Sequence, residues 1–199
     1  MIHFYKPNTK VTGSACSFYL SDKDGAFFSQ FIKQASWNEK SRTGSFAKDD
    51  PNKKASIKLT DVEIAGIIDA LESDREFSAY HQSEKQVATF KILPYVDKIT
   101  GIRKGFSYTL SKSAKDDSTN KLSFVIGFTF PEARRLRQHL EFLLNRYDYA
   151  KAESFQDRQF NNAPTSTPTR TAPKIEFKQH NLDDDGPPVT SNQNDGDIW

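Results

Sequence analysis

Cysteine is almost missing from this chain of 199 residues, which contains Cys16 and no other. A single thiol cannot form an internal disulfide or a cysteine-rich metal site, and it favours a reducing compartment. Runs of about 18 apolar residues, the length needed to span a membrane, are also missing. The first ten residues are too polar for a signal peptide. We therefore expect a cytoplasmic protein, in the host cytoplasm if a virus encodes it, that does not span a membrane.

The sequence also lacks the motifs of the common enzyme classes. Neither GxGxxG nor GxxxxGK[ST] occurs, and there is no GxSxG motif. The four histidines lie far apart in the chain, and the acidic pairs fall in turn-like or tail-like segments rather than on rigid elements. We expect no catalytic residues, no metal site and no cofactor, and hence a protein that is not an enzyme.

One stretch of the chain occurs twice, at residues 55–72 and at residues 124–141. Each copy has alternating apolar residues, which predict a strand with one buried face. Each copy continues with a Thr-x-x-Glu capping box, at Thr60 and Thr129, and then with apolar residues at helical spacing. Chance similarity of two strand–helix junctions is the alternative. The agreement of strand, cap and helix at one offset favours an internal duplication.

Hydrophobic periodicity predicts several strands before each helix. The expected strands are 14–20, 26–37, 55–59, 76–81, 87–95, 106–111 and 122–128, with a short one at 42–46 and helices at 61–73 and 130–149. Residues 1–13 read as a loose arm. The fold class is therefore α+β, with two strand–helix repeats at about 14–74 and 75–149, curved antiparallel sheets backed by helices, and a domain ending near residue 150.

After residue 150 the composition changes. Residues 161–173 are rich in Pro and Thr, and residues 183–199 contain five Asp and no Lys or Arg. Residues 1–150 hold 23 Lys and Arg against 18 Asp and Glu, whereas residues 151–199 hold 5 against 8. A basic body with an acidic tail is one pattern of nucleic-acid-binding proteins. We expect 151–199 to be a flexible linker and a disordered acidic tail.

Aromatic residues alternate with cations in several of the predicted strands. Aromatic rings can stack on bases of any sequence, and Lys and Arg neutralise phosphates, so this pattern favours binding of single-stranded nucleic acid. The alternative is that each Phe lies in the core and each Lys is merely solvated. The candidate single-stranded DNA-binding residues are Phe31, Lys33, Trp37, Arg42, Lys53, Lys54, Lys58, Lys91, Arg103, Lys104, Tyr108 and Lys112.

The segments GAFFSQFIKQASW (25–37) and DDPNKKASIKLTDVE (49–63) resemble the core of the transcriptional positive cofactor four family. The duplication is similar to that of the Whirly and Pur-alpha proteins, which pair two such units. Proteins of this superfamily bind single-stranded DNA across curved antiparallel sheets with helices behind them. By this resemblance, Trp37 would stack on a base, while Lys33, Lys53 and Lys54 would neutralise phosphates. Ser113 stands near the position that matches Trp37 in the second copy, so we expect the two halves to bind unequally.

The end of the chain resembles the acidic tail of bacterial-type single-strand binding proteins. The residues that carry this resemblance are Asp195, Asp197, Ile198 and Trp199. We expect a protein that binds single-stranded DNA with little sequence preference and protects it during replication, recombination or repair, while the tail recruits partner proteins. A transcriptional regulator or coactivator of the same fold and a protein–protein adaptor are the alternatives. Formation of a homo-oligomer is left open.

Overall fold

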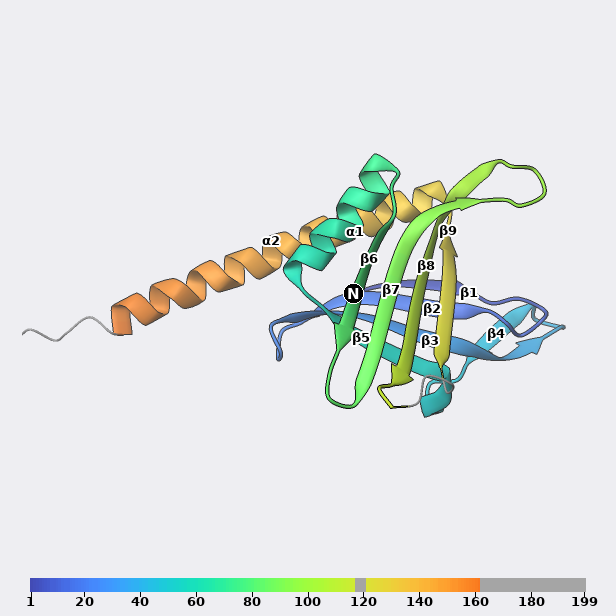
Figure 1. The fold of residues 1–199 in the computed structure, drawn as a ribbon, viewed down its shortest axis with the longest axis horizontal. Coiled ribbons are helices and arrows are strands. Elements are labelled where there is room, and N and C mark those ends of the chain that lie inside the picture. Colours follow the sequence, from blue (N-terminus) through green and yellow to red (C-terminus); the bar gives the residue numbers. More distant parts are fainter. Residues whose placement is uncertain (117–120, 162–199) are drawn as a thin grey trace, which may run out of the picture. The chain divides into compact units, whose positions relative to one another are not determined.

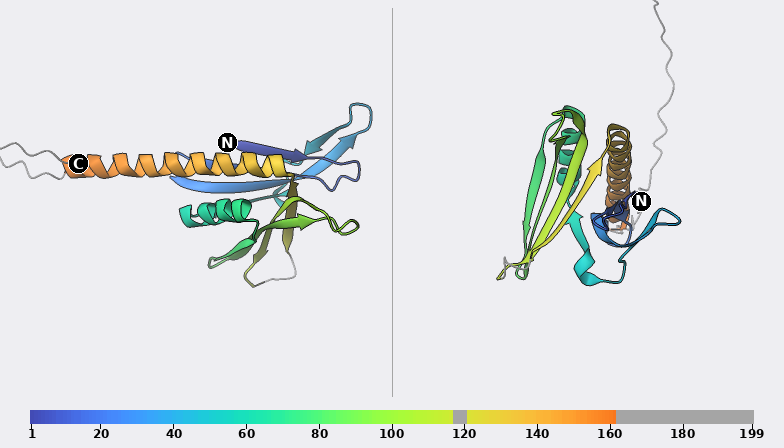
Figure 2. Two further views of the ribbon diagram at one scale, coloured as in Figure 1. Left: turned by 90° about the horizontal axis from the view of Figure 1, so that it is seen from above. Right: turned by 90° about the vertical axis from the view of Figure 1, so that its right-hand side faces the viewer.

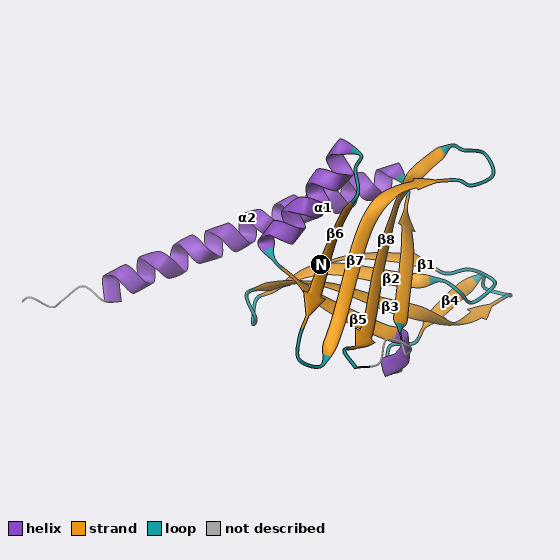
Figure 3. Ribbon diagram, viewed as in Figure 1, coloured by secondary structure: helices purple, strands orange, loops and turns teal. Residues whose placement is uncertain are grey.

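A computed structural model of the protein describes residues 1–116 and 121–161. The first half contains β1 (Ile2–Lys6), β2 (Ser14–Ser21), β3 (Ala26–Asn38), β4 (Thr43–Phe46), a short 3-10 helix (Pro51–Lys53), β5 (Lys54–Leu59) and α1 (Asp61–Ser73). The second half contains β6 (Phe77–Gln82), β7 (Gln86–Val96), β8 (Arg103–Ala114), β9 (Leu122–Phe128) and α2 (Phe130–Asn161). Figure 1 and Figure 3 show these elements.

The strands form two antiparallel sheets that follow the chain order. In the first sheet β1, β2 and β3 are neighbours, and the far side of β3 pairs with β5 along one part and with β4 along another. In the second sheet the order is β6-β7-β8-β9. Each sheet is followed directly by a helix, and the two helices begin at Asp61 and Phe130. This arrangement agrees with the predicted duplication, and the β4 hairpin is an addition to the first copy.

The two sheets share one hydrophobic core, and their strands cross at a steep angle in Figure 1. Phe31 on β3 stacks on Tyr108 of β8, with ring centroids 5.2 Å apart. Phe18 on β2 lies 5.3 Å from the same ring. These aromatic pairs join the sheets face to face, and burial of their large rings is a major stabilising term.

Both helices start with a Thr-x-x-Glu cap whose glutamate also reaches the other sheet. Glu63 accepts hydrogen bonds from the backbone N–H of Thr60 and, with its other oxygen, contacts Nε2 of His81 on β6 at 2.5 Å. Glu132 likewise accepts from the backbone N–H of Thr129 and forms an ion pair with Lys6 of β1. Each cap thus fixes its helix to the first strand of the sheet that the helix does not follow.

The helices lie side by side, as both views in Figure 2 show. The side chain of Arg137 on α2 bridges them, since its Nη1 lies 3.2 Å from a carboxylate oxygen of Glu72 on α1. Gly66 of α1 lies against the ring of Phe77, so that an added Cβ would be 2.4 Å from a ring carbon. No helix within the described residues is long and apolar enough to cross a membrane.

Two predictions about the ends of the fold were wrong. Residues 1–13 are not a loose arm, because β1 pairs with β2, and Phe4 packs edge-on against Phe128 with ring centroids 4.8 Å apart. The second helix does not end at Tyr149, because α2 continues to Asn161. Polar residues beyond Tyr149 obscured the helix, since they lack the apolar stripe that marks a packed helix.

Candidate nucleic-acid interface

The first sheet presents an aromatic surface on the face that points away from the core. Side chains alternate along each strand, so Tyr5, Tyr19 and Phe28 point opposite to the buried Phe4, Phe18 and Phe27. The register places these outward positions on neighbouring strands. We call this surface the aromatic face and define it by His3, Tyr5, Tyr19, Phe28, Trp37 and Phe46.

Trp37 belongs to the aromatic face because of a bulge in β3. Gln34 pairs with Phe46 and Trp37 pairs with Gly44, although Gln34 and Trp37 are three positions apart. Phe46 and Gly44 lie two positions apart on β4 and therefore point to the same face of the sheet. The one extra residue in β3 therefore makes Trp37 point to the same face as Gln34. Trp37 is half-buried, and its indole N–H has no partner among the described residues.

The rings of the aromatic face are arranged in pairs. Tyr19 and Phe28 are stacked, with centroids 5.5 Å apart and planes 19° apart. Tyr5 lies 5.6 Å from Phe46 and 5.9 Å from the ring of His3. Tyr5 is 58% exposed, so its ring is accessible to a flat ligand. Bases stack on exposed aromatic rings of this kind.

A buried glutamine holds the loop between β1 and β2 against this face. Oε1 of Gln34 accepts hydrogen bonds from the backbone N–H groups of Asn8 (2.9 Å) and Gly13 (3.2 Å). Its Nε2 donates to the carbonyls of Asn8 (2.9 Å) and Ser36 (3.0 Å). Gln34 itself is buried, and its four bonds fix the segment that carries Tyr5 relative to the β3–β4 hairpin.

Cations border the aromatic face on the side of β4 and β5. Lys54 and Lys58 project outward from β5, in register with Ile32 and Phe28 of β3. Nζ of Lys54 donates to the carbonyl oxygen of Lys48 at 3.2 Å. A cleft of about 540 Å³ lies at this border. Its lining residues are Tyr5, Pro7, Arg42, Thr43, Gly44, Ser45, Phe46 and Lys48. The cleft therefore combines the exposed ring of Tyr5 and the half-buried ring of Phe46 with two cations.

The outward face of the second sheet is chemically different. Its side chains are mostly hydroxyl groups, from Ser78, Thr89, Ser107, Thr109, Ser111, Ser113 and Ser123. Two large aromatic residues also lie there, Tyr80 (60% exposed) and Tyr95 (46% exposed), together with the apolar Val125 (56% exposed). Lys91 on this face pairs with Glu76, with Nζ and Oε2 2.7 Å apart. The two copies thus present unequal surfaces.

The predicted site residues fall into several places. Trp37, Arg42, Lys54 and Lys58 lie on or beside the aromatic face. Lys33 and Lys53 line a separate cleft of about 400 Å³ near β9. Nζ of Lys33 lies 5.1 Å from the ring centroid of Phe124 there, at cation–π distance. Sequence reasoning grouped cations that the fold distributes over two clefts.

Three predicted cations of the second half are held by carboxylates. Lys91 pairs with Glu76, Arg103 pairs with Asp74, and Lys104 pairs with Asp97 at 2.6 Å. The bonded carboxylate of Asp97 raises the pKa of Lys104. Arg103 also lies over the rings of Phe106 and Phe130. These cations have structural partners, which were hidden in the sequence by their separation along the chain.

Lys112 connects the two sheets. Its Nζ donates to the backbone carbonyl of Ser56 on β5 at 2.8 Å, and burial lowers its pKa. It lies at a groove between β5 and the β6–β7 turn, and Lys58 and His81 line the same groove. The bond to Ser56 gives Lys112 a structural role, and a phosphate contact by Lys112 stays a prediction.

Two predicted base-stacking residues were assigned wrongly. Phe31 and Tyr108 are fully buried, each with 0% exposure, and they stack on each other between the sheets. No base can reach either ring, so both stabilise the core instead. Sequence reasoning missed Tyr5, Tyr19 and Phe46, which are on the accessible side. In the sequence, Ile2 and Phe4 alternate with His3 and Tyr5, and this pattern could have indicated that Tyr5 lies on the accessible face of a strand.

The predicted partner-binding residues Asp195, Asp197, Ile198 and Trp199 lie outside the described residues. Within residues 1–116 and 121–161, no three His, Cys, Asp or Glu side chains are grouped closely enough to hold a metal ion.

Comparison with solved structures relates this fold to known ones. WHY1 from Arabidopsis thaliana superposes with a TM-score of 0.53 and 19% sequence identity, over 81% of this chain and 93% of WHY1. WHY3 from the same plant superposes with a TM-score of 0.53 and 18% sequence identity, over 80% of this chain and 95% of WHY3. The fold is that of the Whirly proteins. The plant transcriptional regulator PBF-2 also has the Whirly fold. It superposes with a TM-score of 0.52 and 18% sequence identity, over 77% of this chain and 86% of PBF-2. No protein-family model and no curated protein sequence matches the chain. The Whirly-like α+β fold predicted from the sequence is thus confirmed.

Proposed function

We propose that this chain binds single-stranded DNA, with little sequence preference, on the aromatic face of its first sheet. The observation that carries the proposal is the gathering of Tyr5, Phe46, Arg42 and Lys48 around one open cleft. Rings supply stacking that every base accepts, and cations track the phosphates. The Whirly fold supports the proposal, because the sequence resembles a superfamily that binds single-stranded DNA across such sheets.

The asymmetry of the two sheets supports binding by the first half. The outward face of the second sheet offers hydroxyl groups, and its Lys91 is paired with a carboxylate. Hydroxyl groups alone provide neither the stacking nor the counterion release that drives sequence-independent binding. The first sheet has both rings and lysines.

We expect Tyr5→Ala to weaken binding of oligo(dT) by about 1–3 kcal/mol, because one stacked base loses its platform. Tyr80→Ala is the matched control, since Tyr80 has nearly the same exposure but lies on the second sheet. Fluorescence titration at several salt concentrations measures both. Equal affinity of the Tyr5 variant, the Tyr80 variant and the unchanged protein would overturn the assignment.

Replacing Lys54 and Lys58 by Ala should flatten the slope of log affinity against log salt concentration by roughly 1.4 units, at about 0.7 per phosphate contact.

The proposed role is protection of single strands during replication, recombination or repair in the cytoplasm, with residues 183–199 recruiting partner proteins. A second role, transcriptional regulation, has one observation in its favour, since PBF-2 of the same fold is named a plant transcriptional regulator. Preferential binding of duplex promoter DNA over oligo(dT) would favour that role. A protein–protein adaptor would bind neither.

A further inference from the structure

A basic groove follows the free edge of β5, outside the cleft on which the proposed function rests. Among the described residues, β5 pairs with β3 on one side and with no strand on the other. Two adjoining clefts of about 300 Å³ and about 350 Å³ lie along that open side. We call them together the edge groove and define it by Lys54, Ser56, Lys58, His81, Gln86 and Lys112. None of the described residues that line it is Asp or Glu, so its charge favours an anion.

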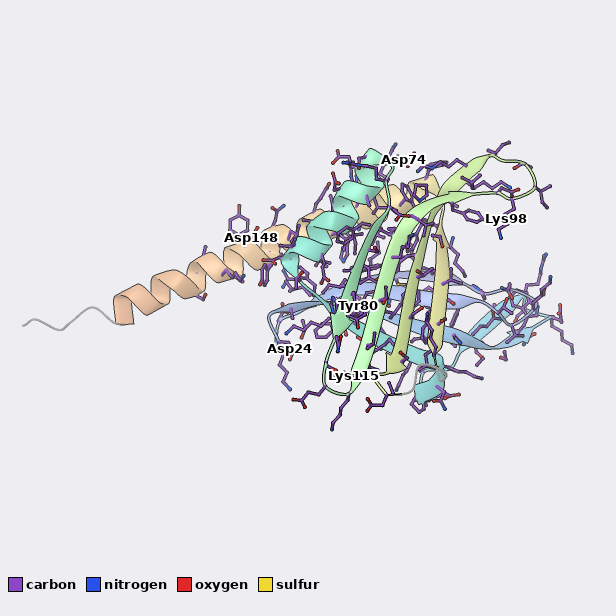
Figure 4. All side chains as sticks on the ribbon, in the orientation of Figure 1. Asp24, Asp74, Tyr80, Lys98, Lys115 and Asp148 are labelled. Atoms are coloured by element: carbon purple, nitrogen blue, oxygen red, sulfur yellow. The ribbon has the colours of Figure 1, made fainter. Side chains whose placement is uncertain are left out.

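The second sheet supplies the wall of the groove that faces β5. Alternation along β8 places Lys112 on the same face as the buried Leu110, and alternation along β7 places Gln86 on the same face as the buried Phe90. Both side chains therefore point toward the first sheet. Figure 4 shows this end of the second sheet, with Lys115 labelled there. The core-facing side of the second sheet thus becomes polar where it reaches the edge of β5.

Lys112 stands between the two walls with capacity for a further partner. Its Nζ donates to the carbonyl of Ser56 at 2.8 Å, and no second acceptor among the described residues is bonded to it. An ammonium group has three N–H donors, and a phosphate oxygen would use those that remain. The positive charge of the groove comes mainly from its lysines, because Glu63 contacts Nε2 of His81 at 2.5 Å. Burial lowers the pKa of Lys112, and a bound anion would offset this cost.

The groove opens onto the aromatic face. Lys58 points outward from β5 and is the cross-strand neighbour of Phe28, whose ring belongs to that face. The same Lys58 lines the groove. Gln30, which points outward from β3 like Phe28, lines the other part of the groove together with Lys54. A chain that stacks on Phe28 can therefore cross β5 and enter the groove along a continuous basic surface.

We propose that the edge groove holds backbone phosphates of the single strand next to the part that stacks on the aromatic face. The inference rests on the proposed function, which brings the strand to Phe28. Lys54 and Lys58 are four residues apart on β5, about 13 Å at 3.3 Å per residue, and Lys112 is bonded between them at Ser56. Three cations thus follow one extended edge, as a chain of phosphates requires.

The lining also favours phosphates over bases. No Phe, Tyr or Trp is among the described residues that line the groove, so it offers no platform for stacking. Contacts to phosphates alone carry no sequence information, which agrees with binding of little sequence preference. An acidic peptide would also suit the lysines, but it would make no use of the aromatic ring at the mouth of the groove.

The test compares oligo(dT) of about 5 and about 16 nucleotides, near the two ends of the range for single-strand sites. Lys112→Met in the full chain should lose several-fold affinity for the longer strand and none for the shorter one. Its slope of log affinity against log salt concentration should fall by about 0.7 with the longer strand only. Lys112→Arg should bind like the unchanged protein, because it keeps the charge. Lys98→Met is the matched control, since it removes an exposed lysine from the β7–β8 loop.

The outcomes separate the groove from the proposed function. Equal affinities of Lys112→Met and Lys98→Met for the longer strand would overturn the groove and leave the proposed function intact. An equal loss at both lengths would also overturn it, because Lys112 would then act through the packing of the sheets. Failure of the unchanged protein to bind either strand would overturn the proposed function itself.

Two further probes test other anions. Inorganic phosphate that raises the melting temperature of the unchanged protein but not of Lys112→Met, without an effect of strand length, would assign the groove to free phosphate. Binding of an oligoglutamate peptide that depends on Lys112, again without an effect of strand length, would assign it to an acidic protein segment. Either result would overturn the path proposed for the strand.

Discussion

His139 is a buried residue of α2, with 7% exposure, and its Nε2 has no hydrogen-bond partner among the described residues. Burial lowers the pKa of its imidazole, and the positive charges of the chain's amino terminus and Arg135 lower it further. The folded protein therefore favours neutral His139. The unfolded chain, with a pKa of about 6.5, takes up a proton first as the pH falls. Stability from this residue is complete above that pH and decreases below it.

We expect His139→Leu to reduce the loss of stability between pH 7.5 and pH 5.5, because leucine fills the site and does not titrate. Urea unfolding at the two pH values measures the difference. Gln138→Leu, at the exposed neighbouring position, is the control and should keep the pH dependence of the unchanged protein. A pH dependence of His139→Leu as steep as that of the control would contradict the prediction.

At the scale of elements, the caps of the two helices are the clearest trace of the duplication. Oγ1 of Thr60 accepts from the backbone N–H of Glu63 at 3.1 Å, and Glu63 returns a bond to Thr60 at 2.8 Å. Glu132 makes the corresponding bond to the Thr129 backbone at 2.8 Å. Both glutamates then hold a strand of the opposite sheet. The caps therefore stabilise the packing of the sheets as well as the helices.

Thr60→Ala should lower the free energy of unfolding by about 0.5–2 kcal/mol, because α1 loses a hydrogen bond at its first turn. Affinity of the folded protein for oligo(dT) should not change, since Thr60 lies away from the aromatic face. Denaturant unfolding and titration measure the two effects. Thr89→Ala, an exposed threonine of β7, should change stability by less than about 0.5 kcal/mol. A similar loss for both variants would argue against a special role of the cap.

At the scale of the whole molecule, the charge of the chain is divided between a basic body and an acidic end. The net charge is +2, and residues 183–199 contribute five Asp without Lys or Arg. Removing them brings the net charge to +7. Attraction for the phosphate backbone then increases, and salt screens this effect.

Deleting residues 183–199 should raise affinity for oligo(dT) at low salt, and the gain should disappear at high salt. The same deletion should abolish capture of replication or repair proteins in pull-down experiments, if these residues recruit partners. Removing only Ile198 and Trp199 separates the two effects, because it leaves the charge unchanged. Capture that survives this shorter deletion would show that the apolar end does not recruit them.

The sequence by itself determined the elements and their repetition. Alternation in the strands and the Thr-x-x-Glu caps are local signals, and α1 begins and ends where the periodicity predicts. The start of α2 followed from the same signal. β1 was missed although Ile2 and Phe4 alternate with His3 and Tyr5, because the strand has only five residues. The end of α2 was missed because a helix without an apolar stripe leaves little local pattern.

Only the tertiary structure decided which rings bind and which are buried. β3 has aromatic residues on both faces, with Phe27 and Phe31 on one and Phe28 on the other, and alternation cannot tell which face another sheet will cover. Packing of the second sheet buried Phe31 against Tyr108 and left Phe28 outside. Ion pairs such as Arg103 with Asp74 likewise depend on residues that only folding brings together. Local patterns fix the direction of a side chain relative to its strand, whereas its accessibility depends on distant parts of the chain.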